Sequence, residues 1–186
     1  MDKQHSIWEH GLKFGGFLSV FLIIVTVIGY LAGVDNDNNT FGLVSYVLLF
    51  FGIGFSILQY RNNYLGGYIE FGKAFSVGFV TGFISAVIVG VFLYLFYSFI
   101  APDALQIDED LIVQKLQESN PDMTDEMIEM SLSYAKKFMT PFWTSFITVF
   151  WSTGMSALFA LLSALFTKKE NFEEGQRLGE NHKEEE

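Results

Sequence analysis

Four long apolar blocks, separated by polar segments, dominate the pattern of the chain. None contains Asp, Glu, Lys or Arg, and they cover residues 14–34, 41–59, 74–100 and 142–167. A helix needs about 20 apolar residues to cross a hydrocarbon layer of about 30 Å. Helices buried in soluble proteins rarely stay uncharged for so long. The pattern therefore predicts an all-α polytopic membrane protein with four transmembrane helices.

The connection between the third and fourth blocks, residues 101–141, is the longest polar segment and holds nine acidic and three basic residues. Its spacing predicts two short amphipathic helices. The first covers about 108–119 and ends at Asn120-Pro121, because proline cannot continue a helix. The second starts after Thr124 as N-cap. Its apolar positions recur at three- and four-residue spacing: Met127, Met130, Tyr134 and Phe138.

Composition agrees with this fold class. Hydrophobic residues form 51% of the 186 residues, 21 are Phe, and 17% are charged. So few charges would not cover so many aromatic side chains in a soluble domain. The first block is longer than the apolar core of a signal peptide, so we expect it to remain as a span. With no Cys, the chain has neither disulfides nor cysteine-ligated metal sites.

Basic residues near the ends of spans predict which side faces the cytoplasm. Six of them share one predicted side: Lys3, Lys13, Arg61, Lys73, Lys168 and Lys169. Lys136 and Lys137 lie on the opposite side and argue against this assignment, but the larger group favours both termini in the cytoplasm. Residues 1–169 then form a single membrane domain with an outer loop at 101–141. Residues 170–186, acidic and without apolar periodicity, are expected to be a disordered cytoplasmic tail.

Small residues recur every four positions in the third and fourth spans. The first row is Ala74, Gly78, Gly82, Ala86 and Gly90, and the second is Thr144, Thr148, Ser152, Ser156, Ala160 and Ala164. Gly11, Gly15 and Ser19 open the first span in the same way. Such rows let membrane helices approach closely, so we expect these faces to pack together. The alternative is that the Ser/Thr row lines a polar pathway, although hydroxyls in helices usually bond to the preceding turn.

The stretch GGYIEFGKAF, residues 66–75, is one residue short of a phosphate-binding loop. Ala74 replaces the Ser or Thr that would hold magnesium, and a membrane helix rather than a buried strand precedes the glycines. We therefore expect no nucleotide binding. Aromatic and basic residues here and after the last span are instead predicted to anchor the protein at the membrane interface: Tyr68, Phe71, Lys73, Lys168 and Lys169.

Other candidate sites are incomplete. Asp35, Asp37 and Asn39 occupy calcium-loop positions, but Thr40 and Tyr46 stand where Gly and Glu are needed, so we expect a solvated turn. Asn38-Asn39-Thr40 also fits a glycosylation sequon. The acidic residues of 101–141 are interpreted as solvated helix faces, with weak binding of a divalent cation or a partner as the alternative.

The three histidines, His5, His10 and His182, lie in terminal segments, and the spacing of His5 and Glu9 fits a surface pair on a helix. No ionisable residue lies within the four blocks, which argues against proton pumps, coupled transporters and voltage sensors. No basic patch suits nucleic acid. We expect a non-enzymatic protein without cofactor or metal.

Five local patterns resemble one family: GLKFGGFLSV, GGYIEFGKAFSVGFVTGFIS, Pro102-Asp103, FMTPFW and LSALFTKKE. They are similar to a small bacterial membrane-protein family of unknown function, domain of unknown function forty-one ninety-nine, over Gly11–Lys169. The resemblance implies a four-helix protein of the bacterial inner membrane with an extracytoplasmic third loop. It implies no activity and supplies no catalytic residues.

Two functional hypotheses remain, with a membrane enzyme a distant third. The first is an accessory or assembly protein that binds a membrane-protein partner through the acidic outer loop or its membrane helices. The alternative is a small transporter or channel subunit that works as a homo-oligomer around the Ser/Thr face of the fourth span. The amphipathic helices would rest on the lipid bilayer, on the bundle or on the partner.

Overall fold

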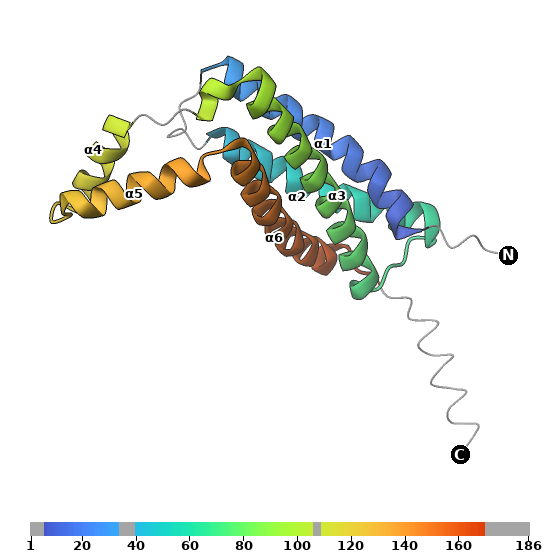
Figure 1. The fold of residues 1–186 in the computed structure, drawn as a ribbon. Coiled ribbons are helices and arrows are strands. Elements are labelled where there is room, and N and C mark those ends of the chain that lie inside the picture. The colour runs from blue at the N-terminus through green and yellow to red at the C-terminus, as the bar shows by residue number, and fades with distance from the viewer. Residues whose placement is uncertain (1–5, 34–39, 106–108, 170–186) are drawn as a thin grey trace, which may run out of the picture. The chain divides into compact units, whose positions relative to one another are not determined.

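A computed structural model describes residues 6–33, 40–105 and 109–169 (Figure 1). The chain divides into two compact units, one within Met1–Ala86 and Ser152–Glu186, the other Val87–Trp151. The described residues form helices: α1 (Ile7–Leu31), α2 (Thr40–Tyr64), α3 (Phe71–Leu95), α4 (Glu109–Ser119), α5 (Asp125–Phe138) and α6 (Pro141–Thr167). A π-helical turn (Phe96–Ile100) continues α3, and a 3-10 turn (Pro102–Leu105) follows.

Four of these helices are long and apolar enough to cross a membrane. They comprise Ile7–Leu31, Phe41–Tyr64, Phe71–Ile100 and Pro141–Thr167, with 25, 24, 30 and 27 residues. A helix of 25 residues is about 38 Å long, which exceeds a hydrocarbon layer of about 30 Å. The predicted all-α architecture with four membrane-length apolar helices is confirmed for the described part of the chain.

α1 begins before its uncharged block and α2 ends after its block, whereas α6 matches its block to within one residue. α1 begins at Ile7 rather than near residue 14, because the Ser6 hydroxyl caps the helix by accepting from the Trp8 amide at 3.3 Å. α2 runs past Gln59 to Tyr64 and is followed by Gly66 and Gly67, whose positive φ angles of 59° and 93° suit glycine. Absence of charge therefore misses the start of α1 and the end of α2, where polar and charged residues continue the helix.

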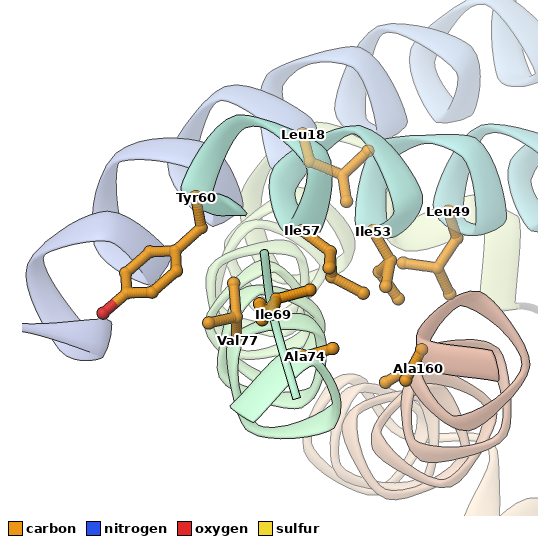
Figure 2. Close-up of a cluster of buried hydrophobic side chains, with 10 residues drawn as sticks. Leu18, Leu49, Ile53, Ile57, Tyr60, Ile69, Ala74, Val77 and Ala160 are labelled. Atoms are coloured by element: carbon orange, nitrogen blue, oxygen red, sulfur yellow. The ribbon is translucent and has the colours of Figure 1, made fainter. Parts of the chain in front are cut away.

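A buried hydrophobic cluster fills the first unit. Its members come from all four long helices and from the α2–α3 connection: Leu18, Leu49, Ile53, Ile57, Tyr60, Ile69, Ala74, Val77, Ala160 and Ala164. Figure 2 shows Ile53 and Ile57 of α2 directed toward Ala74 and Val77, with Ala160 of α6 beside them. α3 is the most buried of the four spans. The first unit is therefore built around α3.

In the second unit, α4 and α5 occupy the positions that the sequence predicts for the helices of the loop. The Thr124 hydroxyl accepts from the Met127 amide at 3.4 Å, which confirms this residue as the N-cap of α5. Lys136 of α5 forms an ion pair with Glu109 of α4 at 2.7 Å. The predicted start of the first loop helix at Asp108 lies outside the described residues.

Several other predictions also concern residues outside the described part. These are the turn with Asp35, Asp37, Asn38 and Asn39, the terminal histidines His5 and His182, and the tail 170–186.

Candidate functional site

The small-residue face of α3 lies against α6 in the first unit. A methyl group built on Gly78 would lie 3.0 Å from the Ala160 Cβ, and one on Gly82 would lie 2.5 Å from the Ser156 Cβ. Real Cβ atoms essentially never approach within 3.0 Å. Glycine at 82 therefore permits a separation of α3 and α6 that any larger side chain would prevent.

The members of the two predicted rows differ in burial. In the second unit, Gly90 lies against the side chain of Val149. Thr148 and Ser152 are partly buried. The buried members are Ala74, Gly78, Gly82, Ala86, Gly90, Ser156, Ala160 and Ala164. The role of this face in holding the bundle together stays a prediction.

α1 approaches α3 through its own glycines. A methyl on Gly15 would lie 2.6 Å from the Thr81 carbonyl oxygen, and one on Gly11 would lie 2.7 Å from Val80 Cγ1. By contrast, nothing lies within 4 Å of such a methyl on Gly16. The close contact is therefore confined to one face of α1.

A buried polar network joins α1, α2 and α3 beside these glycines. His10 Nε2 lies 3.0 Å from the Ser56 carbonyl oxygen and 3.2 Å from Ser56 Oγ. Ser56 Oγ lies 2.8 Å from Thr81 Oγ1, which donates to the Val77 carbonyl oxygen at 2.8 Å. His10, Ser56 and Thr81 are all buried.

The number of protons that each group can donate fixes the direction of the hydrogen bonds in this network. A carbonyl oxygen only accepts, so His10 Nε2 carries the proton and donates to Ser56. The Thr81 hydroxyl uses its single proton on Val77, so it accepts from Ser56 Oγ, which in turn accepts from His10. His10 is thus the terminal donor of a three-helix chain of hydrogen bonds. Its Nδ1 has no hydrogen-bond partner among the described residues.

Aromatic rings enclose the imidazole of His10. Phe14 stacks on it with ring centroids 4.3 Å apart, and Tyr60 and Tyr64 meet it edge-on at 5.0 and 5.8 Å. The interpretation of His10 as part of a terminal segment is wrong, because α1 begins at Ile7 and turns this residue toward α2. His10 lies about 100° from the Gly11–Gly15–Ser19 row around α1, so that row alone does not indicate its burial.

The hydroxyls of α6 fall into two groups. Thr148 donates to the Thr144 carbonyl oxygen at 2.8 Å and Thr167 to that of Ser163 at 2.7 Å, so both bond within their own helix. The second group has buried hydroxyls with no hydrogen-bond partner among the described residues: Ser145, Thr153, Ser156 and Ser163. Unpaired buried hydroxyls are costly, so Ser156, the one member of the predicted row among these four, distinguishes the Ser/Thr row from a purely intrahelical one.

The connection between α2 and α3 pairs with the end of α6. Ile69 and Lys169 exchange two backbone hydrogen bonds of 3.0 Å each, as an isolated antiparallel bridge. Arg61 Nη1 donates to the Thr167 carbonyl oxygen at 3.0 Å. Lys169 Nζ lies 5.4 Å from the Tyr68 ring centroid, within the range of a cation–π contact. The end of α2 and the α2–α3 connection are therefore held against the end of α6.

The segment that resembles a phosphate loop forms this connection and the start of α3. Gly66 and Gly67 form the turn, and Lys73 lies in the first turn of α3. The predicted interface anchors Tyr68, Phe71, Lys73, Lys168 and Lys169 are all exposed. Anchoring at a membrane and the absence of nucleotide binding stay predictions.

Residues 13–169 match the family described as "Protein of unknown function (DUF4199)". The chain belongs to the DUF4199 family. The resemblance seen in the five sequence patterns is thereby confirmed. No curated protein and no solved structure matches the chain.

The matched segment of this DUF4199 protein holds most of the polar network but not all of it. Ser56, Thr81 and Gly15 lie inside residues 13–169, whereas His10 and Gly11 precede them. Among the described residues, no group of three or more His, Asp or Glu side chains is placed to hold a metal ion. The arrangement joins helices by close packing and hydrogen bonds.

Proposed function

We propose that this DUF4199 protein is an integral membrane protein that acts as a non-enzymatic accessory or assembly factor. In this proposal it binds a membrane-protein partner through the outer loop, residues 101–141, or through its membrane helices. Four membrane-length apolar helices support the membrane assignment. The observation that carries the binding role is the exposed apolar face of α5.

Exposed apolar side chains form this face, and acidic side chains lie elsewhere on the surface of the same helix. Met127, Met130 and Tyr134 are 50, 55 and 57% exposed, while Ile128 of the same helix is buried. Glu126 and Glu129 are exposed on the same helix. Methionine side chains adapt to differently shaped partners. The expected partner therefore presents an apolar surface with basic residues at its edge.

We further propose that the protein lies in the bacterial inner membrane with both termini in the cytoplasm. Arg61 and Lys169 support this orientation. Both lie where the end of α2 and the α2–α3 connection contact the end of α6, so they belong to one end of the first unit. Basic residues at the membrane surface favour the cytoplasmic side.

Site-specific photocrosslinking tests the binding role. A photoreactive phenylalanine analogue at Met130 should crosslink to one distinct protein in intact cells, identified by mass spectrometry. The same analogue at Glu129, an exposed neighbour off the apolar face, is the matched control and should give much less product. Equal crosslinking from both positions, or crosslinks to lipid alone from Met130, would contradict the proposal.

The second candidate is a transporter or channel subunit that works as an oligomer. The unpaired buried hydroxyl of Ser156, a member of the Ser/Thr row, favours it, because a polar pathway would supply its missing partner. Solute flux into reconstituted vesicles should then fall when Ser152 and Ser156 are both changed to Ala. Alanine is preferred to leucine because Ser156 packs on Gly82, so a larger residue would disturb the fold. Vesicles that show no flux with the unaltered protein would exclude this candidate.

A further inference from the structure

A groove with aromatic walls runs along α1 and α2 in the first unit. Its volume is about 300 Å³, and its walls are Phe14, Phe17 and Phe21 of α1 with Leu48, Phe51 and Phe55 of α2. At its floor the helices nearly touch, since a methyl on Gly52 would lie 2.5 Å from Leu18 Cδ1. Its lining is almost entirely apolar.

The groove has the size of part of an acyl chain. The seven steps from Phe14 to Phe21 rise by about 10 Å along α1, at about 1.5 Å per residue. At about 30 Å³ for a group the size of a water molecule, 300 Å³ holds roughly ten such groups. A slender, flexible chain fits this space better than a bulky helix does.

A positive charge lies at one end of the groove. α1 and α2 run antiparallel, with Phe14 beside Phe55 (ring centroids 6.1 Å apart) and Gly29 beside Phe41. Lys13 Nζ lies 5.9 Å from the Phe14 ring centroid, and the side chain is exposed. Among the described residues Lys13 forms no ion pair. Glu9, one turn earlier, is also exposed and is the acidic group of this helix end.

We propose that this groove binds an anionic phospholipid, with an acyl chain along the Phe walls and the phosphate on Lys13. A lysine at a helix end reaches the headgroup level while its stem lies along apolar surface. Any lipid can fill an apolar groove in a bilayer, but the ammonium selects a lipid with net negative charge. This inference rests on the proposed insertion of the four helices into a membrane.

Native mass spectrometry of the detergent-purified full-length protein tests this site. The protein is incubated with phosphatidylglycerol or with phosphatidylcholine of the same acyl chains, and bound lipid is measured. Phosphatidylglycerol should be retained preferentially. Because one lysine at an anionic surface is typically worth a factor of about five in affinity, Lys13→Gln should lower that retention about fivefold. Leu48→Trp should fill the groove and reduce the retention of both lipids.

Two matched variants distinguish loss of this site from the general effect of removing a cation or adding an indole. Lys73→Gln removes an exposed cation at the start of α3, and Val47→Trp adds the same indole beside Leu48 but outside the groove lining. Both should retain lipid like the unaltered protein. Equal retention of the two lipids, or an equal loss in Lys73→Gln and Lys13→Gln, would overturn the site even if Leu48→Trp failed to fold.

Carbonate extraction of membranes from the same cells tests membrane insertion separately from lipid binding. Protein that stays in the extracted membranes but shows no lipid preference would overturn only the lipid site. Protein released by carbonate would overturn both.

Discussion

At the scale of single residues, His10 links helices that are far apart in the sequence. It donates to Ser56 of α2, which is hydrogen-bonded to Thr81 of α3. Sequence patterns could place Ser56 and Thr81 on membrane helices, but not show that their hydroxyls meet, because that depends on how α2 and α3 rotate against each other. The apolar pattern does not indicate that His10 is buried, because α1 begins at Ile7, well before the uncharged block.

A double-mutant cycle on His10 and Ser56 should show coupling between them. His10→Ala and Ser56→Ala should each lower thermal stability in detergent, and the double variant should lose less than the sum. Side-chain hydrogen bonds in membrane proteins average about 0.6 kcal/mol, with about 1.7 kcal/mol as the upper end. His10→Ala combined with Ser76→Ala is the control, because the Ser76 hydroxyl bonds within its own helix to Gly72. Strict additivity for His10 and Ser56 would contradict the network.

Two adjacent glycines of α1 should respond differently to the same substitution. Gly15→Ala places a methyl 2.6 Å from the backbone oxygen of Thr81, which cannot move aside, whereas Gly16→Ala meets nothing within 4 Å. Overpacking costs about 1–3 kcal/mol, so Gly15→Ala should lower the melting temperature and Gly16→Ala should leave it nearly unchanged. Similar melting temperatures for the two variants, measured in one detergent, would contradict the close approach of α1 to α3.

At the scale of elements, α3 is the helix on which the first unit is assembled. The four-residue spacing in the sequence predicted that α3 and α6 pack through small residues, and the structure places Gly78 against Ala160 and Gly82 against Ser156. The sequence did not show that α1 meets α3 through Gly15 at the same level as Thr81. Contacts of this kind depend on helix rotation, which a row of small residues restricts but does not determine.

The packing of α3 on α6 can be tested with one bulky substitution. Gly82→Leu should weaken the fold strongly, because even its Cβ would lie 2.5 Å from the Ser156 Cβ. Gly154→Leu on α6 is the matched control, since nothing lies within 4 Å of a methyl there. Thermal unfolding in detergent should show a large loss for Gly82→Leu alone. An unchanged melting temperature for that variant would contradict the packing of α3 on α6.

At the scale of the whole molecule, the apolar blocks predicted the number and order of the long helices. They predicted both ends of α6 to within one residue but missed the start of α1, which Ser6 caps, and the end of α2, which Arg61 continues. Nor did they show that Ile69 and Lys169 pair, because one backbone bridge leaves no pattern in the side chains.

We propose a four-span membrane protein whose 101–141 loop lies outside the cytoplasm, and cysteine labelling tests this topology most directly. The chain contains no Cys, so single substitutions report without background. Asn63→Cys and Ser133→Cys are both at exposed positions, one at the end of α2 and one on α5. A membrane-impermeant maleimide on intact spheroplasts should label Ser133→Cys at once and Asn63→Cys only after permeabilisation. Labelling of Asn63→Cys with protection of Ser133→Cys, or equal labelling of both before permeabilisation, would contradict this topology.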